Sequence, residues 1–201
     1  MSSKRSWGAD PGTANLGAVL VEGARPLVII DVVTRPATKG RAATKHKPAR
    51  PVLPKRLQVR VWVLRDCLAF DVDLESELYD AADAFVTALD WLRGQDLAWG
   101  GDVAAVERVI GNVSPDLADV AGIVVGQLWM WSVVERPKRP SAATWRRRML
   151  DIPGNTPAAV AERVALERVR EEVPDWPATA SGHAAEAYWI ARWGAEVCDG
   201  K

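Results

Sequence analysis

The sequence predicts an α/β fold, a mixed β-sheet with α-helices on its faces. Segments rich in β-branched residues are concentrated in the first third of the chain, and a short apolar run follows at residues 103–110. Other segments, mostly later in the chain, have apolar residues that recur at helical spacing. With 201 residues, of which 48% are hydrophobic and 26% charged, the chain can bury one good core. We therefore expect residues 1–201 to form a single domain.

The chain begins with a predicted hairpin that places an aspartate at a strand end. Residues 7–22 read WGADPGTANLGAVLVE, so Asp10 is followed by a Pro-Gly turn and then by a second strand at 16–22. The segment LVIIDVV at 27–33 adds a further strand after the turn GARP. Asp-Pro-Gly commonly forms turns, because proline presets φ, glycine accepts positive φ and aspartate bonds back to the backbone. Asp10 therefore either shapes this turn or serves as a metal or phosphate ligand, and the second role needs partners elsewhere.

A basic segment follows these strands. Nine Lys and Arg residues and no acidic residue lie between Arg35 and Arg60, although the whole chain has 26 residues of each charge. The rest of the chain is therefore acidic, and we interpret the molecule as an acidic body with a basic arm. Residues 35–56 contain too few large apolar side chains to pack, so we expect a flexible insertion there.

The remaining elements follow from the same periodicities. Residues 57–64 alternate valines with larger or polar side chains, as a half-exposed strand does. Pro115 is tolerated in the first turn of a helix, and Gly94 marks a helix end. The expected order is a helix at 74–94, a strand at 103–110, a helix at 115–134, a basic connection at 136–150, and helices at 157–173 and 181–197.

Cysteine content and hydropathy indicate the cellular compartment. The two cysteines, Cys67 and Cys198, have no CxxC spacing, so neither a disulfide framework nor a cysteine zinc site is indicated. No apolar run reaches the ~20 residues that a membrane-spanning helix needs. We expect a soluble, cytoplasmic protein.

Three further residues are candidate partners for Asp10. Glu107 closes the apolar run VAAVE, and His183 and Glu186 are three residues apart, so they share one face of the last helix. Each also has an ordinary explanation: Glu107 as a charge at a strand end, and His183 as a residue near a helix start at Ser181.

Taken together, these elements resemble the RuvC-type Holliday-junction resolvases of the ribonuclease H-like superfamily, as a divergent member. The shared features are a first strand ending in DPG, a glutamate after an apolar strand in AAVERVIGN, and a last helix with a histidine and an acid in HAAEA. The segments SPDLADVAGIVVGQ and WRRRMLDIPGNTPAAVAERV are similar to the intervening parts. The resemblance covers most of the chain outside residues 34–72, and it implies a ribonuclease H-like sheet.

The resemblance implies that Asp10, Glu107, His183 and Glu186 are the catalytic residues and the metal ligands. The implied activity is metal-dependent cleavage of four-way DNA junctions by paired nicking, in DNA recombination and repair. Two Mg²⁺ ions ~3.5–4 Å apart suit phosphodiester hydrolysis, with Mn²⁺ able to substitute, and hard Mg²⁺ favours carboxylate oxygens. Asp10 would bridge the ions, and His183 would bind or orient the attacking water as a neutral imidazole.

DNA contacts are expected from the basic residues. The usual glutamate loop of the family carries an aromatic residue where this chain has Ile110, and the family's lysine before the last helix has no clean match, since Ala161 and then Arg163 stand there. Arginines near residue 147 would substitute as phosphate contacts. The expected DNA-binding set is Lys39, Arg41, Lys45, Lys47, Arg50, Arg146, Arg147, Arg148 and Arg163.

A homodimer is also expected, because resolving a four-way junction needs two symmetric cuts and a twofold dimer supplies two related sites. The helix at 115–134 supports it with more apolar surface than one sheet face requires. Its apolar row is Val120, Val124, Leu128 and Trp131, flanked by Ile123, Gln127 and Met130. Burial of this helix within its own domain is the alternative.

Other functions remain open from sequence. DPGTANLG also resembles the phosphate-binding turn of actin and sugar-kinase ATPases, but these need two similar domains and a second phosphate loop, which is not found here. A nuclease acting on other branched DNA, or a non-catalytic junction-binding protein on the same fold, would share the elements described above.

Overall fold

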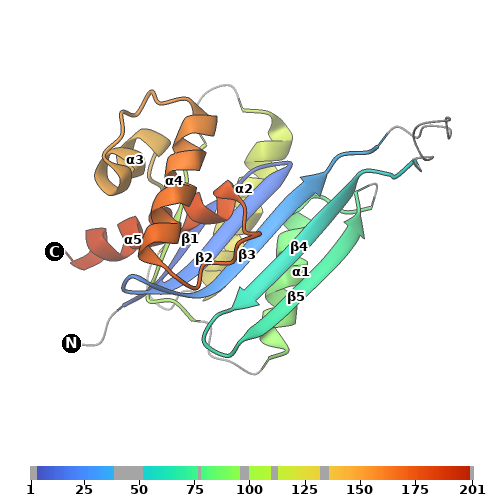
Figure 1. Cartoon of the computed structure of the whole chain (residues 1–201), viewed down its shortest axis with the longest axis horizontal. Coiled ribbons are helices and arrows are strands. Elements are labelled where there is room, and N and C mark those ends of the chain that lie inside the picture. Colours follow the sequence, from blue (N-terminus) through green and yellow to red (C-terminus); the bar gives the residue numbers. More distant parts are fainter. Residues whose placement is uncertain are drawn as a thin grey trace, which may run out of the picture.

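The computed structural model describes residues 4–38, 52–76, 78–95, 100–109, 113–131 and 136–199. They form one six-stranded sheet and five helices (Figure 1). The strands are β1 (Arg5–Asp10), β2 (Asn15–Glu22), β3 (Arg25–Arg35), β4 (Arg56–Val63), β5 (Leu68–Glu75) and β6 (Val103–Val106). The helices are α1 (Ala81–Arg93), α2 (Pro115–Trp131), α3 (Ala142–Leu150), α4 (Ala158–Glu172) and α5 (Gly182–Asp199).

The sheet is mixed, with the order β5-β4-β3-β2-β1-β6. Strands β1 to β5 form an antiparallel meander, and β6 returns parallel to β1. Beyond β6, Lys138 forms a parallel bridge with Ala105, in the place of one more strand. The fold is therefore of the α/β class with a mixed sheet, as the sequence predicts.

Helices cover both faces of the sheet because the inner strands are apolar on both sides. Leu16, Ala18 and Leu20 of β2 belong to the core beneath α1 and α2, whereas Val19 and Val21 belong to the core beneath α3, α4 and α5. This split follows the two-residue period of a strand. In Figure 1, α3, α4 and α5 lie in front of the sheet and α1 and α2 behind it.

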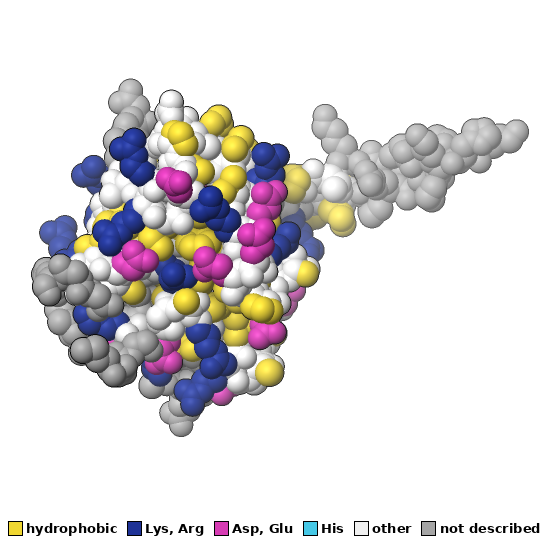
Figure 2. All heavy atoms as spheres, turned by 60° about the vertical axis from the view of Figure 1, so that its left-hand side comes forward, with side chains coloured by type: hydrophobic (Ala, Val, Ile, Leu, Met, Phe, Trp, Pro, Cys, Tyr) yellow, Lys and Arg dark blue, Asp and Glu magenta, His cyan; other side chains and the backbone are white. Residues whose placement is uncertain are grey.

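The surface over one face mixes both charges. Figure 2 shows Lys and Arg side chains interspersed with Asp and Glu, with apolar side chains between them. Several exposed charges are paired locally, such as Arg148 with Glu196 at 3.3 Å and Arg192 with Glu172 at 2.9 Å. Neighbouring carboxylates therefore neutralise part of the positive charge on the surface of this protein.

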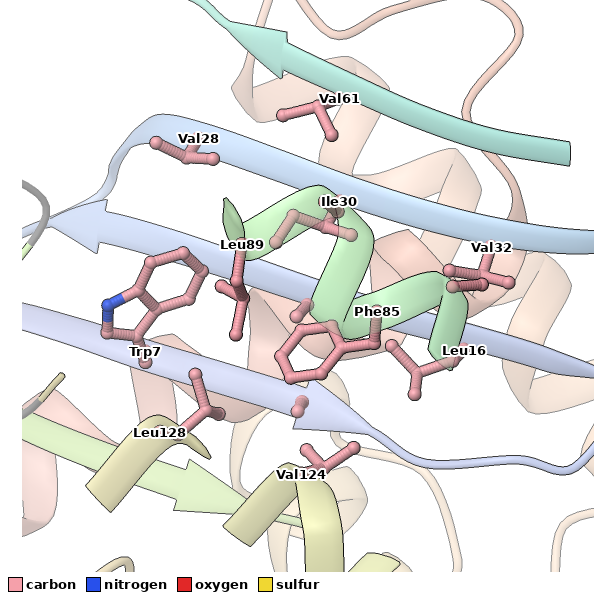
Figure 3. Close-up of a cluster of buried hydrophobic side chains, with 14 of the residues drawn as sticks. Trp7, Leu16, Val28, Ile30, Val32, Val61, Phe85, Leu89, Val124 and Leu128 are labelled. Carbon is pink, nitrogen blue, oxygen red and sulfur yellow. The ribbon is translucent and has the colours of Figure 1, made fainter. Parts of the chain in front are cut away.

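The core beneath α1 and α2 fixes the position of both helices on the sheet. Phe85 and Leu89 of α1 point toward the strands, and Val124 and Leu128 of α2 pack next to them (Figure 3). All four side chains are fully buried. The apolar row that the sequence predicts on α2 is therefore largely packed inside this chain.

Several expected elements differ from the structure. The helix expected at 74–94 begins at Ala81, because Leu74 belongs to β5 and Asp80 caps the helix by accepting bonds from the amides of Ala82 and Asp83. Strand β5 was not expected. The connection expected at 136–150 contains helix α3, which begins after Ser141, whose hydroxyl accepts a bond from the Thr144 amide.

The other expected helices are present. Helix α4 matches the expectation to within one residue at each end, and α5 begins after Ser181 as predicted. Helix α2 begins at Pro115 as expected and ends at Trp131, and residues 132–135 lie outside the described part of the chain. The basic insertion joins β3 to β4, and its residues 39–51 also lie outside the described residues. None of the helices among the described residues is long and apolar enough to cross a membrane.

Candidate functional site

A row of residues across the sheet forms the floor of the site. Asp10 is the last residue of β1 and lies opposite Gly17, which lies opposite Asp31 on β3. Asp31 in turn faces Arg60 on β4. Directly paired residues in neighbouring strands project to the same face of a sheet. Two carboxylates thus flank a glycine on the face that α5 covers.

The glycine lets the start of α5 lie directly on the sheet. A Cβ atom on Gly17 would be 2.2 Å from the carbonyl oxygen of His183, and one on Gly8 would be 2.2 Å from that of Ala187. No side chain can occupy such a space, so both positions require glycine for this approach. His183 is therefore held above β2, between the two aspartates of the row.

Each aspartate holds one part of the start of α5. Asp10 Oδ2 is 2.7 Å from His183 Nδ1. Asp31, fully buried, accepts hydrogen bonds from the Ser181 amide at 2.9 Å and from its hydroxyl at 2.5 Å. Arg60 pairs with Asp31 at 2.7 Å and donates to the Thr179 carbonyl at 2.6 Å, so a second strand fastens the same turn.

Three of the predicted site residues form a group suited to a cation. Asp10, His183 and Glu186 each present a ligand atom, and these atoms lie within 4.8 Å of one another. The spacing of three on α5 places His183 and Glu186 on one face, as the sequence predicts. Glu186 is 4% exposed, so its carboxyl group lies in a low-dielectric environment.

Glu107 approaches this group from β6. It follows the strand directly, and its amide donates to the Ala9 carbonyl at 2.9 Å, which places it beside the end of β1. Its Oε2 accepts a 2.6 Å hydrogen bond from the indole Nε1 of Trp145. Glu107 lies outside the 4.8 Å group but is close enough to interact electrostatically with Asp10 and Glu186.

Arg146 takes a different position from the one expected. It was expected to contact DNA, but it is 8% exposed, and its Nη2 is 2.7 Å from Glu186 Oε1. Its guanidinium also lies over the Trp145 ring, 5.3 Å from the centroid. Helix α3 therefore inserts one fixed positive charge among the carboxylates, and Arg146 is not available as an exposed phosphate contact.

The ionisation of the site reflects burial and crowded charge. Burial raises the pKa of Glu107 to about 7, and the charge of Asp10 adds to the rise. Burial and Asp10 likewise raise the pKa of Glu186 to about 8, although Arg146 opposes this. Burial alone would lower the pKa of His183, but the hydrogen bond and charge of Asp10, with Glu162 and Glu186, raise it to about 9.

This donor set fits a divalent metal ion. Carboxylate oxygens of Asp10 and Glu186 with an imidazole nitrogen of His183 are ligands that Mn²⁺ and Mg²⁺ accept. Burial and nearby negative charge raise the pKa values of Glu107 and Glu186, and a bound cation would favour the charged, ligating form of both carboxylates. The residues present therefore suit the metal chemistry that the sequence resemblance implies.

The other expected DNA contacts are dispersed. Arg147 is exposed, Arg148 pairs with Glu196 at 3.3 Å, and Arg163 is 3.9 Å from Glu167 on the solvent side of α4. Lys39, Arg41, Lys45, Lys47 and Arg50 lie outside the described residues, as does Ile110. These positions remain predictions.

Sequence reasoning missed several residues around the site. Asn15 Nδ2 is 3.4 Å from His183 Nε2, and Asn15 Oδ1 accepts a hydrogen bond from the Thr34 amide at 2.9 Å. Trp145 and Asp31 were also not singled out. A buried aspartate within the apolar run LVIIDVV was the one local signal available, because an acid there needs a partner.

The fold and the site together define an α/β protein with a buried acidic group suited to a metal ion. No family model matches the sequence, and no curated protein matches it either. Similar solved structures include one of RuvC from Thermus thermophilus, at 15% identity and a TM-score of 0.46, and one of T. thermophilus RuvC in complex with a Holliday junction substrate, at 14% identity and a TM-score of 0.45. Each alignment covers 94% of this chain and 91% of the other.

Proposed function

We propose that this chain is a metal-dependent DNA endonuclease of the cytoplasm that resolves four-way junctions by paired nicking. The observation that carries the proposal is the convergence of Asp10, Glu107, His183 and Glu186 from β1, the end of β6 and α5. Three carboxylates and a histidine at one sheet end suit phosphodiester hydrolysis. The choice of a junction as substrate rests on the order of the sequence motifs.

Each residue has a defined task in this proposal. Asp10, Glu107, His183 and Glu186 would hold two Mg²⁺ ions, or Mn²⁺, which when bound stabilise charge on the phosphodiester and lower the pKa of a water. The hydrogen bond from Nδ1 to Asp10 orients the His183 ring and leaves Nε2 on the side of Asn15, where it can hold or accept a proton. Arg146 orients Glu186, and Trp145 orients Glu107.

The experiment is a cleavage assay on a panel of DNA substrates. Purified protein is incubated with Mg²⁺, Mn²⁺ or EDTA and with a mobile four-way junction, a flap, a fork, linear duplex and single-stranded DNA. We expect metal-dependent nicks in the junction, on opposing strands of like polarity. No metal-dependent cleavage of any substrate would refute the nuclease proposal.

A preference for flaps or forks would point to the alternative, a ribonuclease H-like nuclease acting on other branched DNA. The ATPase alternative needs a second similar domain, and the residues that the structure describes contribute a single six-stranded sheet. We therefore favour a nuclease over an ATP-binding protein.

The basic insertion is proposed to add DNA affinity. Deleting residues 37–54 removes the five basic residues expected to contact DNA there. Each lost phosphate contact flattens the dependence of log K on log salt by roughly 0.9 for duplex DNA. We expect the slope to fall by several units while metal-dependent cleavage survives at low salt; an unchanged slope would assign the insertion to another partner.

A further inference from the structure

A short segment runs beside β6 and lies next to the candidate site. The Lys138 amide donates to the Ala104 carbonyl at 2.8 Å, and the Val106 amide donates to the Lys138 carbonyl at 2.9 Å. The pairing continues past the strand, because the Arg108 amide donates to the Pro140 carbonyl at 2.8 Å. Residues 136–140 are thus fixed in register against the residues on either side of Glu107.

This register brings three arginines together. Arg139 Nη2 is 3.4 Å from the backbone carbonyl of Glu107, and the side chains of Arg108, Arg136 and Arg139 are all exposed. Burial lowers the pKa of Arg139, and the charges of Arg108 and Arg136 lower it further. Among the described residues, no salt bridge joins any of the three to a carboxylate. We name these three residues the arginine cluster.

A cavity lies between Arg108 of this cluster and Glu107 of the candidate site. It has a volume of about 360 Å³ and is lined by Pro11, Glu107, Arg108, Leu117, Ser141 and Ala142, among others. Pro11 follows Asp10 directly, so one wall of the cavity adjoins the end of β1. Glu107 belongs both to this lining and to the acidic group of the site.

We propose that the cavity and the arginine cluster bind a backbone phosphate of the nucleic acid strand, adjacent to the phosphodiester that is cut. This inference rests on the proposed function, because it names a substrate contact of the same site. Like charges held together by backbone pairing are unfavourable unless an anion binds them, and arginine favours phosphate through its fork of N–H donors. Because the cavity opens beside Glu107, a strand whose phosphodiester lies at the acids can place its next phosphates there.

The test compares two double variants that remove the same charge. Arg108→Ala with Arg139→Ala alters the cluster. Arg25→Ala with Arg65→Ala removes two exposed arginines from the turns at the opposite end of the strands. Binding of a four-way junction is measured in EDTA at several salt concentrations. We expect the cluster variant to lower the slope of log K against log salt by roughly 0.7 to 0.9 for each phosphate contact, and the control to leave it nearly unchanged.

A second measurement identifies the ligand as a phosphate. Single phosphates within three nucleotides of the mapped nick are replaced by neutral methylphosphonates. At one or two positions we expect the replacement to weaken binding to the wild type but not to the cluster variant. If every replacement weakens both proteins equally, or if the cluster variant keeps the wild-type salt slope, the inference is wrong and the cluster serves a different anionic partner.

The two proposals fail separately. If the cluster variant shows the altered slope and the phosphonate effect but the protein never cleaves DNA, the proposed phosphate site is supported and the proposed nuclease function is refuted. For that case, in which no nick can be mapped, the phosphonate scan covers the junction branch point. If the variant without Arg108 and Arg139 cleaves with wild-type efficiency and salt dependence, the proposed nuclease function is supported and the proposed phosphate site is refuted.

Discussion

The role of Asp10 depends on its contact with His183, a residue distant in the sequence. A turn-forming aspartate and a ligand look alike in the sequence ADPG. In the folded chain its Oδ2 is 2.7 Å from His183 Nδ1, across 173 positions of sequence. Its side chain is also only 13% exposed, which is low for a residue that merely starts a surface turn. The geometry therefore favours the ligand over the turn former.

We expect Asp10→Asn to reduce metal-dependent cleavage by at least about 10- to 100-fold, because loss of a ligand should cost no less than loss of a residue that only orients a ligand. DNA binding in EDTA should be unchanged or stronger, since the substitution removes a negative charge that repels phosphate. Nicking and gel-shift assays are run side by side. Asp71→Asn is the control, because Asp71 lies on the same sheet face but bonds Gln58 and lies outside the acidic group. Substantial metal-dependent cleavage by Asp10→Asn would show that Asp10 is not an essential metal ligand.

The ionisable groups of the site predict how stability changes with pH. The pKa values of Glu107, Glu186 and His183 in the folded, metal-free protein are about 7, 8 and 9, each above the usual value for that side chain. A group whose pKa is raised by folding stabilises the protein below its unfolded pKa and loses that contribution as pH rises through the folded pKa. The contribution of the site should therefore decline between about pH 4.5 and pH 9.

Thermal unfolding in EDTA at several pH values tests this sign. We expect the melting temperature to fall from pH 5 to pH 9, and Mn²⁺ or Mg²⁺ to raise it more at pH 8 than at pH 6, because metal and protons compete for the same ligands. Glu186→Gln removes one of the three titrations and should flatten the decline in EDTA. A melting temperature in EDTA that rises steadily over this range, in parallel for both proteins, would contradict the expectation.

At the scale of elements, the site depends on how closely α5 approaches the sheet. Gly17 lies beneath the carbonyl of His183, and Gly8 beneath that of Ala187, one turn further along the helix. Asp31, Ser181 and Arg60 then fasten the residues that precede the helix. Close contact at the glycines and hydrogen bonds at the first turn together set the positions of His183 and Glu186 relative to Asp10.

Gly17→Ala should therefore impair activity more than its small size suggests. The added methyl group would lie 2.2 Å from the His183 carbonyl oxygen, so the start of α5 must move. We expect the free energy of unfolding to fall by about 1–3 kcal/mol. We also expect kcat to fall by up to about 100-fold, because misplacement of catalytic groups by ~1 Å can reduce the rate by that factor. Urea unfolding and single-turnover cleavage measure the two effects.

Glu171→Ala is the control for unfolding, since Glu171 is an exposed residue of α4 that lies outside the site. A substitution at such a surface position should change the free energy of unfolding by no more than about 0.5 kcal/mol. Equal unfolding free energies and equal cleavage rates for Gly17→Ala and wild type would show that α5 can shift without consequence for the site.

The elements also show why sequence reasoning succeeded in part. Strand alternation and the three-residue spacing of His183 and Glu186 are local patterns, and they predicted the sheet apart from β5 and placed both residues on one face of α5. Three consecutive arginines at 146–148 look alike in sequence, and only the rotation of α3 against α5 decides that Arg146 is buried while Arg147 and Arg148 are exposed. Helix α3 itself was missed because its sequence AATWRRRML has little apolar periodicity. The pairing of Arg146 with Glu186 joins residues 40 positions apart, and a single sequence carries no signal for such a contact.

At the scale of the whole molecule, the exposed side of α2 is the surface that most needs an explanation. Val120, Val124 and Leu128 of the predicted apolar row are buried in the chain's own core, so that row does not form a docking surface. A different side of the helix carries exposed apolar side chains: Ile123 at 42%, Trp129 at 52% and Met130 at 68%. Gly122 and Gly126 lie on the same side with open space above them, which would let a second backbone approach closely.

We predict that this side of α2 joins two copies of the chain into a homodimer. Two symmetric nicks in a four-way junction need two sites related by a twofold axis, and an isologous contact between two α2 helices supplies one. Sedimentation or light scattering should report about twice the chain mass for the wild type. Ile123→Glu with Met130→Glu should give the mass of one chain and convert paired nicks in the junction to single ones, whereas Val160→Glu, at an α4 position that is 39% exposed, should leave the dimer intact. A double variant that still dimerises would exclude this surface as the interface. A wild-type protein that stays monomeric with and without junction DNA would exclude the dimer itself, and the proposed nuclease would then cut one strand at a time.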